Sequence, residues 1–294
     1  MQIKLIQRKD IDSQKWDACV CQNGHGIIYG LSWFLDCLTE SSWSAFIIED
    51  YRAVLPFYPK TKYFIPYISQ PVLCRYFQVY GDTSAEAMLI SFALNYFKTH
   101  SFKTNINIRL YTKPDWESVI SYEEKFFQQL SLEPVYVDLE GKFDRNTKRN
   151  LRHANTCFIE ISNSDEMSNL EFIFEHDPSA YLKHHRNAIT KICRAAIERK
   201  VGYFLIATTH SKVVGVSFFI EYGQEILFLL NAMNPEGRQY NVSFAAIDHI
   251  IKIHAGSGKI LDFGGSSIQN IARRNLGFGS DTISYRHYFK SFLQ

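Results

Sequence analysis

The stretch YFLIATTHSKVVGVSFFIEYGQEILFLLNAM, residues 203–233, consists of three apolar runs separated by two short polar turns. The turns fall at His210-Ser211 and Tyr222-Gly223, and runs of this length rich in Val, Ile, Phe and Leu are typical of strands. We therefore predict a three-strand antiparallel meander. Beyond it we predict a helix at 244–255, where apolar residues recur at helical spacing, and a strand at 259–265.

The two halves of the chain share one order of predicted elements, with a helix placed before the last strands of each half. In the first half we predict strands at 44–50 and 52–59 and a helix at 84–100. We also read 116–130 as a helix and 134–140 as a strand. This order predicts an α/β (α+β) fold of two tandem domains, each a mixed, mostly antiparallel sheet flanked by helices.

Length and composition agree with two globular domains. The chain has 294 residues, of which 46% are hydrophobic and 21% charged, so it can bury an ordinary core. A net charge of +2 gives no global basic field of the kind that favours nucleic acid. We place an N-terminal domain at 1–140, a basic junction helix at 141–156 and a C-terminal domain at 157–294.

The cysteines and histidines predict neither a metal site nor disulfides. The closest cysteine pair, Cys19 and Cys21, is too tight for a zinc or redox motif. The adjacent His184 and His185 diverge on a helix, so no metal ligand set is complete. With no signal peptide at the start and no run near the ~20 apolar residues that a membrane helix needs, we expect a cytoplasmic protein without a membrane span.

The junction segment 141–156 concentrates positive charge. On a helix, Lys148 and Arg152 share one face, and Arg149 and His153 share the adjoining one. Such a face is commonly just solvated. The alternative is a clamp for a phosphate or carboxylate, because Arg and Lys offer charge-assisted donors and ligands often bind between domains. Arg149 and Arg152 are therefore candidate substrate- or donor-binding residues.

Four segments together carry a resemblance to a known family. They are NTKRNLRHA at 146–154, MNPEGRQYNVSFAAIDHIIK at 233–252, LDFGGS at 261–266 and LGFG at 276–279. In this combination the chain resembles the FemABX-type acyltransferases, which are tandem copies of the GNAT acyltransferase fold. The resemblance implies two GNAT-like domains. The first half matches through its order of elements more than through motifs.

The resemblance also implies a function. Known FemABX members transfer an amino acid from aminoacyl-tRNA to an amine on a cell-wall precursor, and relatives in the wider GNAT fold use acyl-CoA. We therefore expect transfer of an aminoacyl or acyl group from an activated donor, aminoacyl-tRNA or acyl-CoA, to a small-molecule or cell-wall-precursor amine. In this expectation tRNA is a candidate partner and no cofactor is permanently bound.

Two alternatives stay open, because a fold does not fix a substrate. One is an acyl-CoA-dependent N-acyltransferase that acts on a small amine or amino sugar. The other is a catalytically inactive binding or scaffold protein with the same fold. The resemblance implies a phosphate-binding loop of pattern R/Q-x-x-G-x-G/A at 238–243, where Arg238 matches but Asn241 and Ser243 replace the expected small residues. Asn tolerates left-handed angles and Ser can cap a helix, so these three residues are candidate donor-binding residues.

The strand at 259–265 carries a charge inside an apolar run. An unpaired carboxylate there would be costly, so Asp262 must meet water or a partner. It either braces the glycine turn that follows or, as a catalytic carboxylate, holds the incoming ammonium and accepts its proton. Ser266 either caps the next helix or lies at a helix start whose backbone N–H groups bind an oxyanion. Tyr285, on the last strand, packs in the core or serves as the catalytic acid that GNAT-fold enzymes often place there.

Overall fold

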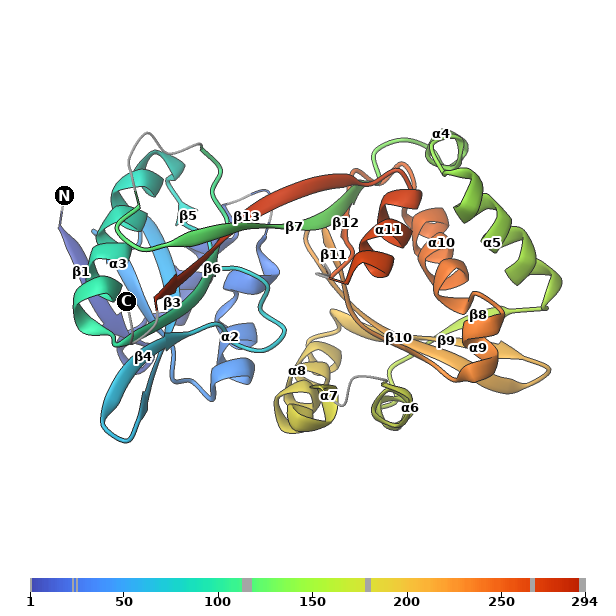
Figure 1. The fold of residues 1–294 in the computed structure, drawn as a ribbon, viewed down its shortest axis with the longest axis horizontal. Coiled ribbons are helices and arrows are strands. Elements are labelled where there is room, and N and C mark those ends of the chain that lie inside the picture. The colour runs from blue at the N-terminus through green and yellow to red at the C-terminus, as the bar shows by residue number, and fades with distance from the viewer. Residues whose placement is uncertain are drawn as a thin grey trace. The chain divides into compact units, whose positions relative to one another are not determined.

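The computed structural model describes residues 2–22, 24, 26–112, 118–177, 181–264 and 268–290 (Figure 1). The chain separates into two compact units. The first unit comprises Met1–Lys125 and Ser284–Gln294, and the second comprises Phe126–Ile283. Strands β7 and β13 each contribute residues to both units, because each of them crosses a unit boundary.

In the first unit, strands pair in the order β1-β2-β3-β4-β6-β13, and β5 also pairs with β3. These pairs are antiparallel, except that β4 and β6 are parallel. The strands are β1 Ile3–Gln7, β2 Ser44–Ile48, β3 Ala53–Lys62, β4 Ile65–Ser69, β5 Tyr80–Gly81, β6 Lys103–Ile108 and β13 Asp281–Lys290. The helices are α1 Ser13–Val20, α2 Ser32–Thr39 and α3 Glu86–His100, with single 3-10 turns at Arg8–Asp10, Ile28–Gly30 and Thr83–Ala85.

Aromatic residues fill the core of the first unit. The rings of Phe46 and Phe57 on β2 and β3 stack with centroids 4.8 Å apart, and Phe97 of α3 lies 5.2 Å from Phe57. Trp16 of α1 and Trp43 are fully buried with ring centroids 4.7 Å apart. Such ring pairs stabilise the packing of helices on the sheet by more than the burial of their apolar area alone.

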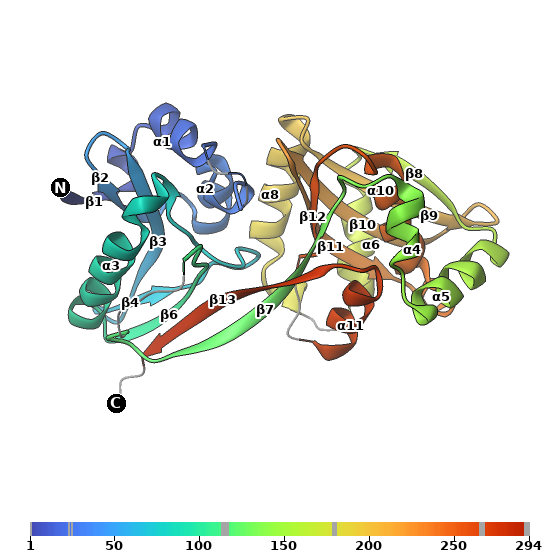
Figure 2. The ribbon, with the colours of Figure 1, turned by 90° about the horizontal axis from the view of Figure 1, so that it is seen from above.

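In the second unit, strands pair in the order β7-β12-β11-β10-β9-β8, and only β11 with β12 is parallel. The strands are β7 Tyr122–Ser131, β8 Glu160–Ser164, β9 Gly202–Thr209, β10 Lys212–Tyr222, β11 Glu225–Met233 and β12 Ile260–Asp262. The helices are α4 Tyr136–Gly141, α5 Arg145–Thr156, α6 Asn169–His176, α7 Tyr181–His184, α8 Arg186–Glu198, α9 Pro235–Gln239, α10 Val242–His254 and α11 Gln269–Gly277 (Figure 2). The predicted meander is confirmed as β9-β10-β11, and each unit is a mixed, mostly antiparallel sheet flanked by helices, as predicted.

Strands β11 and β12 part after a short contact. They pair only over Glu225–Leu227 and Ile260–Asp262. Directly beyond, the register between β10 and β11 shifts so that Leu229 is bulged out of the ladder. A bulge of this kind bends its strand and re-aims its side chains. Among the described residues, no strand covers the β12-facing edge of β11 from Phe228 onward.

Two predicted elements are wrong. The segment read as a helix at 116–130 forms strand β7 over its described second half, because Gln129 and Leu130 pair with β12 far along the chain. The segment read as a strand at 134–140 forms α4, where Leu139 alone is buried. Its alternation of apolar residues does not reflect a buried strand face, since Val137 is 73% exposed.

The division between the units also differs from the predicted one. It falls inside β7 rather than at 141–156, because the second half of β7 pairs with β12. The basic junction helix is present as α5, but it belongs to the second unit. The end of β13 belongs to the first unit because Arg286–Lys290 pair with β6. In the part of the chain that the structure describes, no helix combines the length and apolar character needed to cross a membrane.

Candidate functional site

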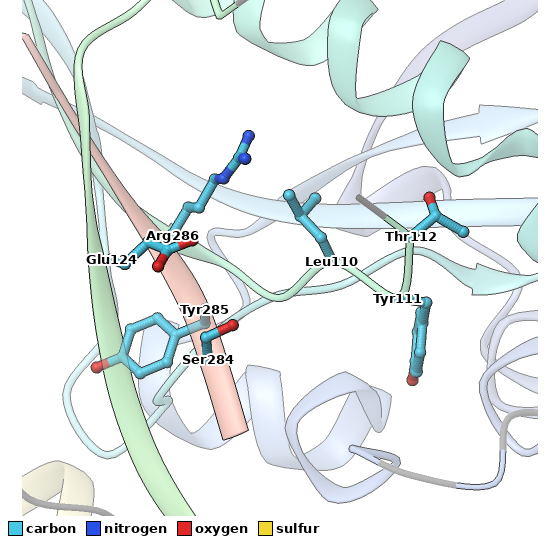
Figure 3. A pocket seen from close by; sticks show the side chains of 7 residues that line it. All are labelled: Leu110, Tyr111, Thr112, Glu124, Ser284, Tyr285 and Arg286. Carbon is cyan, nitrogen blue, oxygen red and sulfur yellow. The ribbon is translucent and has the colours of Figure 1, made fainter. Parts of the chain in front are cut away.

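The first unit contains a pocket of about 330 Å³ at the C-terminal end of β6, hereafter the first-unit pocket (Figure 3). Leu110–Thr112 line it from the loop after β6, Glu124 from β7 and Ser284–Arg286 from β13. All of these residues belong to one unit. The pocket therefore contains two tyrosine phenols, two aliphatic hydroxyl groups and one charge of each sign at the end of the sheet.

Glu86, at the start of α3, fixes the loop of the pocket. Its carboxylate is 2% exposed and accepts hydrogen bonds from the N–H groups of Tyr111 and Thr112, at 2.8 and 2.9 Å. It also accepts one from the Thr112 hydroxyl at 2.7 Å. Three donors to one buried carboxylate make a rigid support, since each of them would otherwise lose its partner.

Arg109 adds a second buried charge next to this loop. Its Nη1 donates to the hydroxyl of Tyr76 at 3.1 Å, and its guanidinium lies 5.6 and 5.3 Å from the ring centres of Tyr76 and Tyr111. Aromatic faces accommodate a guanidinium through the ring quadrupole. The ring of Tyr111 is thus held against a fixed cation.

Tyr285 is half-buried in the first-unit pocket, and burial raises the pKa of its phenol above the usual value. The phenol is therefore protonated at neutral pH and is able to donate a hydrogen bond. The side chains of Tyr285 and Arg286 leave β13 in different directions, as alternation along a strand requires (Figure 3). The ring of Tyr285 lies 6.1 Å from that of Tyr76.

The two charged residues of the pocket are separate. The guanidinium of Arg286 lies 4.2 Å from the ring centre of Tyr122. Figure 3 shows it pointing away from the carboxylate of Glu124. Within the described residues no ion pair joins Arg286 to Glu124. A ligand that carries both an anionic and a cationic group would find a counter-charge for each.

In the second unit, helix α10 begins at the predicted phosphate loop. Asn241 has left-handed backbone angles, with φ 58°, and its side chain does not cap the helix but contacts His153 Nδ1 at 3.2 Å. Without a side-chain cap, the N–H groups of Val242 and Ser243 have no helical acceptor. A helix start of this kind attracts anions.

Arg274 of α11 brings a positive charge to the same helix start. Its Nη1 donates to the Ser243 hydroxyl at 3.2 Å, and its Nε and Nη2 donate to Asn275 Oδ1 at 3.1 and 2.9 Å. Its guanidinium lies 5.8 Å from the ring centre of Phe228, the first residue of β11 beyond the pairing with β12. All of these partners are neutral. Burial lowers the pKa of Arg274 to about 10, so it stays charged at neutral pH.

Asp262 lies at the end of β12 and is 5% exposed. Its Oδ1 accepts a hydrogen bond from the N–H of Gly264 at 2.9 Å, and Gly264 has φ 72°. This contact corresponds to the turn-bracing alternative. Asp262 does not line the first-unit pocket, and its catalytic role stays a prediction.

The other predicted binding residues are dispersed over the second unit. Arg238 is exposed near α10 and donates to the carbonyl of Met233 at 2.6 Å. Arg149 is exposed and donates to Asn146 at 2.7 Å, whereas Arg152 lines a different pocket described below. The structure therefore does not bring Arg149 and Arg152 into one pocket. Ser266 lies outside the described residues.

Sequence reasoning missed Glu86 and Glu124. Glu86 stands in the first turn of a correctly predicted helix, where an acidic residue is ordinary, and its three partners come from a distant loop. The sequence pattern predicts a helix around Glu124, whereas the structure places Glu124 on strand β7, in one pocket with Tyr285. Within the described ranges, no group of three or more His, Cys, Asp or Glu residues could hold a metal ion.

Comparisons with known proteins find likeness in structure and none in sequence. No protein-family model matches the chain, and no curated protein sequence matches it either. Among solved structures, FemX superimposes with a TM-score of 0.66 at 12% identity over 97% of both chains. The C-terminal domain of a putative lysylphosphatidylglycerol synthetase from Agrobacterium fabrum gives 0.58 at 9% identity, over 94% of this chain and 91% of that one.

A tandem GNAT protein from the clavulanic acid biosynthesis pathway gives a TM-score of 0.50 at 8% identity over 98% of both chains. At such identities the likeness is one of fold. The chain has the FemX-like, tandem GNAT type of fold that the sequence motifs implied.

Proposed function

We propose that this chain, which has a FemX-like tandem GNAT fold, is an acyltransferase that moves an aminoacyl or acyl group from an activated donor to an amine. The observation that carries the proposal is the position of Arg274. Among the described residues this cation has only neutral partners. It lies at the start of α10, which has no side-chain cap, and beside the point where β11 separates from β12.

The donor is assigned to the second unit. A donor of either class carries phosphate, which suits the free N–H groups of Val242 and Ser243 together with Arg274. Among the described residues no strand pairs with the β12-facing edge of β11 beyond Leu227, so its backbone N–H and C=O groups suit the polar groups of an extended donor. Both features support aminoacyl-tRNA and acyl-CoA alike, so the donor class is left to experiment.

The first-unit pocket has side chains that suit an amine-bearing molecule. Glu124 suits an ammonium group, and Arg286 suits an anionic group on the same molecule. Tyr285 contributes a phenol whose pKa burial raises, so it is neutral at pH 7. A volume of about 330 Å³ is at the small end of ligand pockets. We therefore propose a small amine, or the amine-bearing end of a larger precursor, with a nearby carboxylate or phosphate.

The reaction itself is an aminolysis. The amine nitrogen forms a bond to the donor's carbonyl carbon, and the C–O bond of an ester or the C–S bond of a thioester breaks. The nitrogen loses a proton and the leaving group gains one, so no metal or redox cofactor is needed for balance. A catalytic role for Asp262 and Tyr285 in these proton transfers remains a prediction.

Donor binding by matched variants tests the proposal. Affinity for acetyl-CoA, longer acyl-CoAs and aminoacyl-tRNA is measured by calorimetry for wild type, Arg274→Gln and Arg273→Gln. Arg273 is an exposed neighbour on the same helix, and it controls for loss of one charge. We expect one donor class to bind. Arg274→Gln should weaken its binding about tenfold or more, while Arg273→Gln changes it by less than about twofold.

A thermal unfolding curve for each variant shows that folding is intact. Binding of no donor class, or equal weakening by both substitutions, would contradict the proposal and favour the alternative of a scaffold protein without turnover.

A further inference from the structure

The second unit contains a pocket of about 260 Å³ between helices α4, α5 and α10, hereafter the α5 pocket. Its charged lining residues are Glu140 on α4, Lys148 and Arg152 on α5, and Asp248 and Lys252 on α10. These residues are distinct from those that surround Arg274. The α5 pocket therefore calls for an explanation of its own.

The α10 wall of the pocket is internally neutral. Asp248 is 6% exposed, accepts a hydrogen bond from the Tyr136 hydroxyl at 2.7 Å through Oδ1 and pairs with Lys252 Nζ at 2.7 Å through Oδ2. Lys252 Nζ also lies 5.2 Å from the ring centre of Tyr136. Burial, aided by the bond to Asp248, raises the pKa of Tyr136, so this wall keeps its hydrogen bonds across the neutral range.

The α5 wall carries two positive charges, Lys148 and Arg152, that form no ion pair among the described residues. Lys148 Nζ donates to the carbonyl of Gly141 at 3.4 Å, and Arg152 Nε donates to the carbonyl of Lys148 at 3.2 Å. The two side chains are one helical turn apart and repel each other. An anion bound between them would remove this repulsion.

We propose that the α5 pocket binds a small molecule through a phosphate or carboxylate group held between Lys148 and Arg152. Arg152 uses only Nε within the described chain, which leaves its two terminal nitrogens for a forked contact with an oxyanion. Leu151, 9% exposed, supplies an apolar floor. Glu140 lines the same pocket and disfavours a polyanion, so a ligand with a single oxyanion fits best.

Helix α5 also provides a matched control. Arg145 and Arg149 lie on the same helix and are exposed, but neither lines the α5 pocket. Replacing this pair by Gln removes the same charge from the same helix as replacing Lys148 and Arg152. The two double variants therefore differ only in whether the charges face the pocket.

The experiment titrates the isotope-labelled full chain with inorganic phosphate and, separately, with acetate, at constant ionic strength. Amide NMR shifts of 145–156 report binding. We expect saturating shifts with at least one of the two anions, which also identifies the preferred oxyanion. Lys148→Gln with Arg152→Gln should weaken binding about tenfold or more, and Arg145→Gln with Arg149→Gln by less than about twofold.

Equal weakening by the two double variants would overturn the proposal, because it would indicate a diffuse basic face of the kind that contacts nucleic acid. Shifts that do not saturate with either anion would overturn it too. Circular dichroism of both double variants confirms that the helix is retained, so a loss of binding is not a loss of fold.

Discussion

Arg274 Nη1 donates to the hydroxyl of Ser243 at 3.2 Å and thereby joins helix α11 to the first turn of helix α10. The same guanidinium donates twice to Asn275 Oδ1, and Asn275 is completely buried. The amide of Asn275 in turn donates to Gln128 Oε1 at 3.4 Å. A positive charge is thus held in place by neutral acceptors, which orient it without neutralising it.

This arrangement predicts that stability and anion binding can be separated at Asn275. Asn275→Ala removes two of the three side-chain hydrogen bonds of the half-buried Arg274 and should lower the free energy of unfolding by about 2–4 kcal/mol. Asn275→Asp keeps the acceptor oxygen for Arg274 and adds a negative charge. Rotation of the Gln128 amide would let it donate to the second carboxylate oxygen and so restore the remaining hydrogen bond. Asn275→Asp should therefore be much less destabilised than Asn275→Ala, yet lose affinity for an anionic donor.

Urea unfolding and donor calorimetry on the two variants check this prediction. If Asn275→Asp bound the donor as tightly as wild type, the charge of Arg274 would have no role in donor binding.

Much of the fold could be predicted from local pattern. The meander at 203–233 and helix α10 follow directly from apolar periodicity and turn residues. Strand β7 could not be predicted in this way, because its segment is rich in helix formers. In addition, its Phe126 is exposed while its Gln128 and Gln129 are buried, which hides the strand pattern. Pairing with a strand more than a hundred residues away decides its structure, and no local pattern records that.

The candidate site was harder to predict than the fold. A family pattern marks Arg238, Asn241 and Ser243 as candidates, and helix α10 does begin within this segment, while their binding roles stay a prediction. The first-unit pocket was missed apart from Tyr285, because Glu124, Thr112 and Arg286 come from three separate segments. The function of such a group depends on a tertiary arrangement that residue spacing does not encode.

Glu86 is expected to be the residue on which the first-unit pocket depends. Glu86→Ala would leave two backbone N–H groups and one hydroxyl without their buried acceptor, and should lower stability by about 3 kcal/mol or more. Glu124→Gln, an exposed change in the same pocket, should alter stability by less than about 0.5 kcal/mol. Urea unfolding monitored by tyrosine and tryptophan fluorescence distinguishes the two. Similar midpoints for both variants would show that the loop does not rely on Glu86.

Gly237 is predicted to be required for the packing of α9 on β10. A Cβ at this position would lie 2.0 Å from the carbonyl oxygen of Val214, which is backbone and cannot rotate away. Gly237→Ala should therefore destabilise the protein by about 1–3 kcal/mol. Gly141→Ala is the control, because a Cβ there meets nothing within 4 Å, and it should be neutral or slightly stabilising. Thermal unfolding compares them, and equal melting temperatures would contradict the prediction.

We expect the protein to lose stability at mildly acidic pH, because three of its histidines are half-buried. Burial is the largest cause that lowers the pKa of His249, His254 and His287 below 6.5. Between the ordinary value and these lowered values the unfolded chain binds more protons than the folded chain, so the free energy of unfolding rises with pH. The contribution of these three neutral histidines to the free energy of unfolding is complete above about pH 7. It is lost as the pH falls through their lowered pKa values.

Urea midpoints at pH 7.5 and pH 5.5 test this, since carboxylates stay largely ionised between those values. His287, whose Nδ1 contacts Asn107 Oδ1 at 2.8 Å, is the most direct position to alter. His287→Gln keeps a polar group near Asn107 but does not titrate, so the difference between the two midpoints should shrink. Exposed His210→Asn controls for removal of a histidine and should leave the difference unchanged. An unaltered pH dependence in His287→Gln would mean that its protonation is not linked to folding.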